Sequence, residues 1–323
     1  MEIEKLKVFS GSSYPELAEK ICDELKIKLS PIRREFYPNG CFEVILEEDV
    51  RGCSVFIIQT SLPDPALLHI QLFETLQMVN AAYKASAREV TVVLTYFSYS
   101  RSDKRWTLRM AINLSLIASF LEVAGMRRMV GVEFHSPQAQ SAFSPRVIVD
   151  HIVTTRFFAQ HLQEKGIVGD KFLILPGDEG FHKRAEKLGF LLKIPVGSVE
   201  KTRVSGEEVK INAIHGPIKG RKIIVYDDEI LTGRTMGQIV DKAMEMGAEG
   251  AILIATHGLF KGNAVANLSS PHIEQIIVTD TLPISPAIKD QLPLTVLSIA
   301  PLLAQVIKII HQEGLLGQLA YGG

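Results

Sequence analysis

The chain has 323 residues, of which 46% are hydrophobic and 22% charged, and its formal net charge at neutral pH is −1. This length and composition are typical of a globular protein with room for two domains. The charge balance lacks the basic excess of a nucleic-acid-binding protein, and no apolar run is long enough to span a membrane.

The cysteines and the first residues indicate a compartment. Cys22, Cys41 and Cys53 show no metal-site spacing, and an odd number of thiols cannot all pair. The first residues lack the basic and apolar regions of a signal peptide. We therefore expect reduced thiols in a cytoplasmic protein.

Strand-like and helix-like segments alternate along the whole chain, which predicts an α/β fold with mainly parallel sheets. Residues 87–95 (AREVTVVLT) resemble residues 248–256 (AEGAILIAT), about half a chain apart. We interpret this as two copies of one fold, with domains of residues 1–145 and 146–323. The alternative is that any two helix-to-strand units of an α/β protein look alike. A closing helix is expected at residues 297–310.

A basic, aromatic loop follows the strand expected at residues 90–94. Open α/β sheets bind ligands at the carboxyl ends of their strands, so this loop is a candidate ligand site. Arg101, Lys104 and Arg105 could hold a polyphosphate, while Trp106 and the neighbouring tyrosines could stack on a base. The alternative is a solvated basic loop.

Two further strands lead into candidate metal ligands. His135 follows a short apolar strand, and Asp178 and Glu179 follow the strand expected at residues 173–176. A lone histidine is more often structural than a ligand, so these residues by themselves leave a metal site open.

Lys201 and Arg203 stand two positions apart on a segment expected to be extended, so their side chains point the same way. They could clamp the oxygens of a transferring diphosphoryl group. The polar residues 205–208 that follow suit a flexible lid. The alternative is a pair of solvent-facing cations on a strand edge.

The most informative pattern is IIVYDDEILTGRT, at residues 223–235. Residues 223–226 predict a buried strand of a parallel sheet, and Asp227 and Asp228 stand where that strand is expected to end. An apolar-periodic segment at residues 236–246 predicts a helix. The pattern is thus a strand, an acidic pair, a hydroxyl-rich turn and a helix.

The turn between the acidic pair and the helix predicts an anion site. Backbone N–H groups at the helix start, with the hydroxyls of Thr232 and Thr235, can hold a phosphate, and Gly233 lets the backbone come close. The two carboxylates would repel phosphate but suit sugar hydroxyls or a divalent cation. Ribose 5-phosphate carries both groups. The alternative is an ordinary surface turn with a threonine N-cap.

This pattern resembles the phosphoribosyl-binding motif of the type I phosphoribosyltransferase fold. The RSDKR sequence at residues 101–105 resembles the nucleotide loop of the ribose-phosphate diphosphokinases, also called phosphoribosyl diphosphate synthetases. Further similar stretches run through nearly the whole chain, at residues 10–18, 256–260, 279–283 and 296–304. Taken together, these segments identify the chain as a member of that family.

The resemblance implies two tandem type I phosphoribosyltransferase-like domains, each with a mainly parallel central sheet flanked by helices, and a C-terminal helix that packs back on the first domain. It implies transfer of the diphosphoryl group of Mg-ATP to the C1 hydroxyl of ribose 5-phosphate, with Mg²⁺ as the cofactor. It also implies homo-oligomers built from dimers, commonly hexamers. Neither a nucleic acid nor a membrane is an expected partner.

The resemblance also assigns residues by role. The residues expected to bind the ribose phosphate are Asp227, Asp228, Thr232, Gly233, Arg234 and Thr235. The residues expected to bind ATP are Tyr37, Asn39, Arg101, Ser102, Asp103 and Arg105. The catalytic residues are Lys201 and Arg203, and the metal-associated residues are His135 and Asp178, with Glu179 as the competitor of Asp178.

Several positions depart from the family pattern. Cys41 replaces a glutamate of the adenine-contacting segment, Ser102 replaces a glutamine, and Gly177 replaces the aspartate expected after the proline. Leu231 replaces an aspartate beside the sugar phosphate, and Arg234 adds a cation there. Two alternatives therefore stay open: a divergent diphosphokinase for another ribose 5-phosphate derivative, and a non-catalytic homologue that regulates a true synthetase.

Overall fold

The computed structural model describes residues 5–205 and 208–319 and divides into two compact units. Unit 1 comprises residues 1–153 and 298–323, and unit 2 comprises residues 154–297. The expected division into domains after residue 145 stays a prediction.

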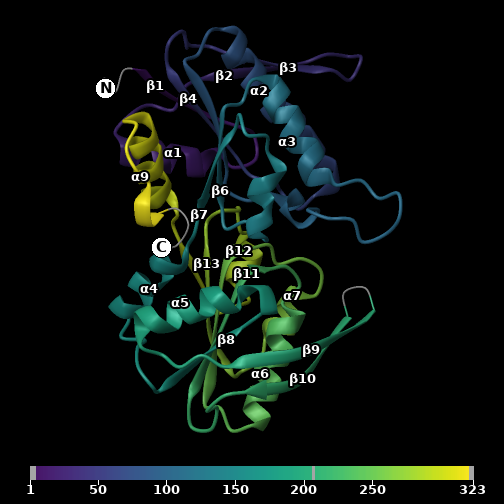
Figure 1. The fold of residues 1–323 in the computed structure, drawn as a ribbon, viewed down its shortest axis with the longest axis vertical. Coiled ribbons are helices and arrows are strands. Elements are labelled where there is room, and N and C mark those ends of the chain that lie inside the picture. Colours follow the sequence, from purple (N-terminus) through teal and green to yellow (C-terminus); the bar gives the residue numbers. More distant parts are fainter. Residues whose placement is uncertain (1–4, 206–207, 320–323) are drawn as a thin grey trace. The chain divides into compact units, whose positions relative to one another are not determined.

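Unit 1 is built on a five-stranded sheet in which every neighbouring pair is parallel (Figure 1). All six residues of its second strand are buried, as expected for a strand covered on both faces. In spatial order the strands are β1 (Leu6–Ser10), β4 (Ser54–Gln59), β5 (Glu89–Leu94), β6 (Arg128–Val132) and β7 (Ile148–Ile152).

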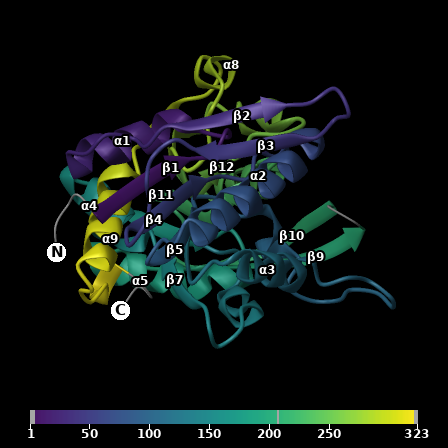
Figure 2. The ribbon, with the colours of Figure 1, turned by 90° about the horizontal axis from the view of Figure 1, so that it is seen from above.

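Helices and an antiparallel hairpin complete unit 1. The hairpin is formed by β2 (Ile32–Phe36) and β3 (Phe42–Leu46). The C-terminal helix α9 lies beside α1, as Figures 1 and 2 both show. The α-helices are α1 (Pro15–Leu25), α2 (Pro65–Lys84), α3 (Asn113–Ala124) and α9 (Ala300–His311), and the 3₁₀ helices are η2 (Ser98–Arg101), η3 (Pro137–Ala142) and η5 (Gly317–Leu319).

Unit 2 repeats this plan with a second fully parallel sheet. Its strands in spatial order are β8 (Phe172–Pro176), β11 (Lys222–Ile230), β12 (Gly250–Gly258), β13 (Ile273–Thr279) and β14 (Leu294–Leu297). Its hairpin pairs β9 (Ser198–Ser205) with β10 (Glu208–His215). Its helices are α4 (Thr155–Glu164), η4 (Glu179–Phe181), α5 (His182–Leu192), α6 (Arg234–Glu245), α7 (Ala264–Leu268) and α8 (Pro286–Lys289).

The sheet of unit 2 is buried on both faces, which explains its continuous apolar strands. Val225 and Leu253 belong to a core that includes residues of α6, whereas Ile224 and Ile252 belong to a core that includes residues of α4 and α5. The alternation follows from the two-residue period of side chains along a strand. Asp227 continues the Val225 series and therefore lies on the α6 side of the sheet.

The two units share one topology. In each sheet the first and second strands are joined through an antiparallel hairpin, and the remaining strands follow in chain order. The predicted fold class, with two similar domains and mainly parallel sheets flanked by helices, is confirmed. Within the described residues, no helix has both the length and the apolar character that crossing a membrane requires.

Candidate functional site

The acidic pair lies within a strand rather than after it. We expected the strand to end at Tyr226, but β11 continues to Ile230. Its pairing with β8 stops at Tyr226, while its pairing with β12 goes on through Asp227 and Glu229. The prediction of the strand end was therefore wrong, because the last residues of β11 keep one hydrogen-bonded neighbour beyond the end of β8.

Strand alternation separates the two aspartates. Asp227 and Asp228 are consecutive in an extended strand, so their side chains leave opposite faces, and Glu229 shares the face of Asp227. The amide of Asp228 donates to Asp227 Oδ1 at 3.0 Å, and the amide of Glu229 donates to Asp228 Oδ1 at 2.9 Å. Glu229 is a carboxylate to which the sequence assigned no role, although alternation along a longer strand would have found it.

Asp227 sits in an environment that disfavours its charge. Burial, followed by the negative charges of Asp228 and Asp178, raises the pKa of the Asp227 carboxyl, against the opposing effects of the Asp228 amide and of Lys201. A cation brought to this carboxylate would relieve that excess of negative charge. The electrostatics thus suit a ligand that brings a metal ion or hydroxyl donors.

Gly177 makes room for Asp227. A Cβ atom at position 177 would lie 2.3 Å from Asp227 Oδ2 and 2.7 Å from its Cγ, so no larger residue fits without moving that side chain. The amide of Gly177 donates to the carbonyl of Tyr226 at 2.9 Å, which holds the loop after β8 against β11. The aspartate expected at this position is therefore excluded by the present position of Asp227.

Lys201 reaches the same loop from strand β9. Its Nζ donates to the carbonyl oxygen of Gly177 at 2.7 Å and lies 3.4 Å from Asp178 Oδ2. Asp178 also accepts a hydrogen bond from the amide of Gly180 at 3.1 Å, so it caps η4. The structure thus brings together Lys201, Asp178 and Asp227, three of the residues singled out in the sequence of unit 2.

Arg203 lies on β9 as well, paired in register with Val209 of β10. Its backbone is extended as expected, and its side chain lies outside the described part of the structure. Residues 206 and 207, at the centre of the expected lid, also lie outside the described residues.

The start of α6 has the form of an anion site. Gly233 is the N-cap in a left-handed conformation (φ 67°), and a Cβ there would lie 2.6 Å from Leu268 Cγ, so glycine is required. The Thr232 carbonyl accepts a hydrogen bond from Asn267 Nδ2 at 2.8 Å, which fixes the turn. Among the described residues no side chain caps this helix. Its first amides can therefore serve a bound anion.

The remaining predicted residues of this turn line the same helix start. Thr232 is half-buried in the turn before α6, and in the first turn of the helix Arg234 is exposed and Thr235 is half-buried. The helix starts at Arg234, two residues before the expected start at Met236. An exposed cation next to the open amides strengthens the preference of this helix end for an anion.

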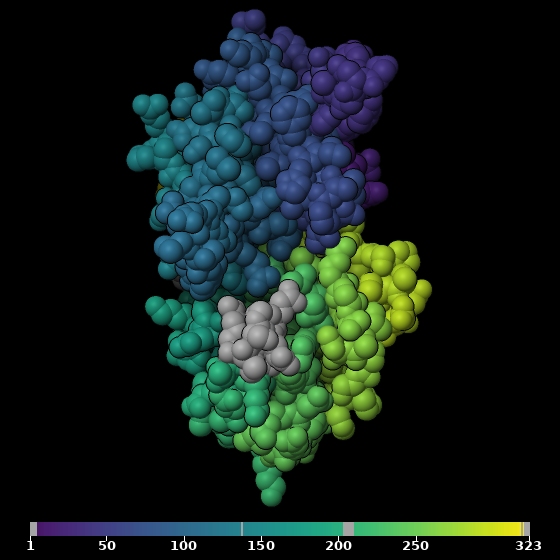
Figure 3. Space-filling model, turned by 90° about the vertical axis from the view of Figure 1, so that its right-hand side faces the viewer, coloured from purple at the N-terminus to yellow at the C-terminus, as the bar shows by residue number. Residues whose placement is uncertain are grey.

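In unit 1, the nucleotide-loop candidates surround the start of α3. Arg101 ends η2, and Ser102 accepts hydrogen bonds from the amides of Asn113 and Leu114 at 3.4 and 3.2 Å. These hydrogen bonds close the loop of residues 102–113. The loop projects beyond α3 in Figure 1, and this part of the chain is coloured blue in the space-filling view of Figure 3. Asp103 is half-buried in this loop, and Arg105 is exposed.

Tyr37 and Asn39 lie at the tip of the β2–β3 hairpin. The Tyr37 hydroxyl lies 3.0 Å from Glu35 Oε2 and 3.1 Å from Glu43 Oε2 and shares its one proton between these two acceptors, and the hydrogen bond to Glu43 raises the Tyr37 pKa. Asn39 Oδ1 accepts from the amide of Cys41 at 3.0 Å and so closes the turn. The hairpin presents a partly exposed aromatic ring on a closed tip.

His135 is exposed just after β6. It belongs to unit 1 and Asp178 to unit 2, and each lies at the carboxyl end of a strand in its own unit. Within the described residues, no group of three or more His, Cys, Asp or Glu side chains converges as a metal cage. The carboxylates of unit 2 still fit Mg²⁺, which proteins commonly hold through one or two carboxylates and the phosphates of a substrate.

Comparison with known proteins identifies the family that this chain resembles. Residues 6–125 match the family model of the N-terminal domain of ribose phosphate pyrophosphokinase, and residues 199–320 match that of the phosphoribosyl synthetase-associated domain. Pyrophosphokinase is a synonym of diphosphokinase.

Relatives of similar length extend the match over nearly the whole chain. A protein of Streptomyces coelicolor, named as a candidate ribose-phosphate pyrophosphokinase, is 38% identical over 95% of this chain and 94% of its own. The ribose-phosphate pyrophosphokinase of Caldanaerobacter subterraneus is 34% identical over 95% of both chains. The crystal structure of a phosphoribosylpyrophosphate synthetase from Mycobacterium smegmatis matches with a TM-score of 0.85 and 34% identity, over 96% of this chain and 99% of the other.

Proposed function

The chain belongs to the ribose-phosphate pyrophosphokinase family, and from that premise we propose that it moves the β,γ-diphosphoryl group of Mg-ATP onto the C1 hydroxyl of ribose 5-phosphate. The products are phosphoribosyl diphosphate and AMP. One observation carries the proposal: the half-buried carboxylate of Asp227 and the uncapped amino end of α6 are joined by the short turn from β11 to α6. A sugar phosphate carries the two groups that such a pair would bind.

In this proposal the turn and helix of unit 2 hold the sugar phosphate. The amides after Gly233, with the hydroxyls of Thr232 and Thr235, bind the 5-phosphate, and Arg234 adds positive charge. Asp227 accepts hydrogen bonds from the ribose hydroxyls. Asp228 adds a second carboxylate at the same edge of the sheet, on the opposite face of β11. The sugar is thereby oriented with its C1 hydroxyl ready for attack at the β-phosphorus.

Lys201 and Arg203 act on the transferring group. Phosphoryl transfer depends on positioning and on stabilisation of developing charge rather than on covalent help from the protein. Lys201 sits on a hairpin strand, and in the described part of the structure its ammonium group contacts a carbonyl oxygen and a half-buried carboxylate. A bound polyphosphate can replace those partners, so the ammonium group of Lys201 would contact the transferring group and stabilise the negative charge that develops on it.

The nucleotide is assigned to unit 1. Arg101, Asp103 and Arg105, in the loop anchored by Ser102, orient the triphosphate, and the hairpin tip with Tyr37 and Asn39 contacts the adenine. His135 in unit 1 is proposed as a Mg²⁺-associated residue, together with oxygen donors of the phosphates, and Asp178 in unit 2 is proposed in the same role. When bound, the ion neutralises polyphosphate charge.

The proposal extends to the setting of the enzyme. The family resemblance supports a homo-oligomer built from dimers. Cys22, Cys41 and Cys53 are free thiols, which suits a cytoplasmic location.

The direct test is to incubate the purified protein with Mg-ATP and ribose 5-phosphate and to measure AMP. We expect stoichiometric AMP and phosphoribosyl diphosphate. AMP formed only with another ribose 5-phosphate derivative would select the second candidate function, which the exposed Arg234 at the phosphate turn favours. An absence of turnover with every ribose phosphate, together with binding to an active synthetase, would contradict both and select a regulatory role.

A further inference from the structure

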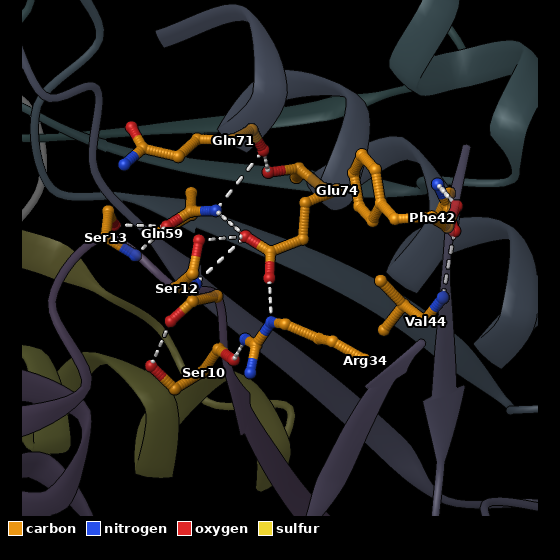
Figure 4. A network of polar contacts seen from close by, with 12 residues as sticks. Ser10, Ser12, Ser13, Arg34, Phe42, Val44, Gln59, Gln71 and Glu74 are labelled. Atoms are coloured by element: carbon orange, nitrogen blue, oxygen red, sulfur yellow. Dashed lines mark hydrogen bonds and ion pairs between the residues drawn. The ribbon is translucent and has the colours of Figure 1, made fainter. Parts of the chain in front are cut away.

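Unit 1 contains a buried carboxylate that has no part in the proposed reaction. Glu74 of α2 is 1% exposed. Its Oε2 accepts hydrogen bonds from the amide of Ser12 at 2.9 Å, the hydroxyl of Ser12 at 2.7 Å and Gln59 Nε2 at 3.0 Å, and its Oε1 pairs with Arg34 Nε. Figure 4 shows these groups converging on one side chain. A carboxylate so deeply buried is stable in its charged form only with such a set of partners.

The partners of Glu74 come from three separate segments. Ser12 lies in the loop after β1, Gln59 ends β4, and Arg34 belongs to β2 of the hairpin. Arg34 also donates to the carbonyl of Ser10 at 3.1 Å. Glu74 and Arg34 therefore tie the hairpin to the carboxyl ends of β1 and β4.

The hairpin needs such ties, because a two-stranded sheet is marginally stable by itself. Its β3 strand is fastened to α2 by Gln77, whose Oε1 accepts from the Val44 amide and whose Nε2 donates to the Phe42 carbonyl, both at 2.9 Å. The rings of Phe42 and Phe73 also meet, with centroids 5.8 Å apart. No residue of β2 is fully buried, and the Arg34–Glu74 pair is its charged attachment to the same helix.

We propose that Glu74 is a positioning residue for the nucleotide: through Arg34 it fixes the β2 side of the hairpin, and with it the tip that carries Tyr37 and Asn39. The proposal rests on the proposed function, in which that tip contacts the adenine. Arg34 lies on β2 and stands three residues before Tyr37, which directly follows the end of that strand, so a loosened Arg34 would let the tip move. A nucleotide would then have to order the tip as it binds, which weakens its affinity.

The test is the Glu74→Gln variant, which keeps the size of the side chain but removes the charge that holds Arg34. We expect KM for ATP to rise about tenfold while kcat and KM for ribose 5-phosphate change less than twofold, since ordering the tip affects nucleotide binding alone. The matched control is Asp150→Asn in the same unit. The Asp150 side chain is also buried, at 5% exposed, and it pairs at 2.5 Å with Arg128, the first residue of β6. This control is expected to lose stability without changing KM for ATP.

A second variant covers the case in which the glutamine variant fails to fold. The double variant Arg34→Met, Glu74→Leu leaves no buried charge unpaired, so it is expected to fold and to keep the raised KM for ATP. Unchanged KM for ATP in this double variant would overturn the positioning role of Glu74. Tyr37→Ala separates the two proposals: if it too leaves KM for ATP unchanged, the assignment of the tip to the nucleotide fails, and if it raises KM while the Glu74 variants do not, only the present inference fails.

Discussion

The two units share one topology and differ at the corresponding helix start. In unit 1, β4 leads to α2, whose N-cap Asp64 accepts hydrogen bonds from the amides of Ala66 and Leu67 at 2.9 and 3.4 Å. In unit 2, β11 leads to α6, whose N-cap Gly233 has no side chain to offer. The amino end of α2 is therefore occupied by the chain's own carboxylate, whereas that of α6 is open to a ligand's anion.

The hairpins of the two units differ in a similar way, because the cation of one is held by a buried carboxylate and the cation of the other is not. Arg34, on the hairpin of unit 1, pairs with the buried Glu74, and Lys201, on the hairpin of unit 2, meets a carbonyl and the half-buried Asp178. A planar guanidinium held by a buried carboxylate suits a fixed attachment, and an ammonium on a flexible stem suits a group that moves to a ligand. On the proposed function, the comparison teaches that one fold can use corresponding elements for structure in one copy and for binding in the other.

The largest effect is expected from Lys201→Ala, which tests whether the cation of the unit 2 hairpin is free to act. We expect kcat to fall by roughly 10²–10³, the loss typical of removing one group that stabilises a transition state. Thermal unfolding should change little, because the side chain is partly exposed. The control is Lys210→Ala on the neighbouring strand β10, an exposed lysine for which activity should stay at the wild-type level.

Gly177→Ala tests the room made for Asp227. The new Cβ would lie 2.3 Å from Asp227 Oδ2, so the carboxylate must move, and we expect kcat/KM for ribose 5-phosphate to fall by about 10²-fold, as for a misplaced positioning group. The control is Gly180→Ala in the same loop, where the nearest atom to the new Cβ is 3.9 Å away. Equal activity of the two variants would show that the small size of Gly177 is not needed for the site.

Gly233→Ala tests the open helix start. Backbone strain and the clash with Leu268 should lower the free energy of unfolding by about 1–3 kcal/mol and raise KM for ribose 5-phosphate, as measured by denaturation and steady-state kinetics. Gly166→Ala carries a similar φ of 71° with no neighbour within 4 Å of the new Cβ. It should therefore show the strain without the change in KM.

Asp64→Ala tests the capped helix start of unit 1, and its effect should be the smallest. The loss of the cap should lower the free energy of unfolding by about 1 kcal/mol. KM for ribose 5-phosphate should not change, because this helix end has no ligand role in the account. A change in that KM would mean that unit 1 also takes part in binding the sugar phosphate.

The sequence predicted the architecture because several central strands contain continuous apolar runs, such as those at residues 55–58, 173–175 and 223–226. The segment at residues 223–226 lies in β11 and that at residues 90–94 in β5, as expected. The end of β11 was not predicted, because the local sequence does not show that β11 continues to pair with β12 after its pairing with β8 has ended. Helix α6 began earlier than its apolar pattern, since Arg234 and Thr235 are polar residues of its first turn.

The candidate site could be predicted only in part for a related reason. Asp227 and Lys201 were found from local motifs. The contact of Gly177 with Asp227 joins two strands, and Ser12 and Glu74 stand 62 positions apart, so neither contact leaves a local pattern. In the sequence, Gly177 looked like the loss of an aspartate. The fold shows that the side chain of Asp227 occupies the space that a side chain at position 177 would need.

The most direct measurement of the central claim is a crystal structure of the protein with ribose 5-phosphate bound. The account predicts one sugar phosphate per chain, with its phosphate on the amides that follow Gly233 and its hydroxyls toward Asp227. A phosphate at the start of α2, or a sugar bound away from Asp227 while the start of α6 stays empty, would contradict it.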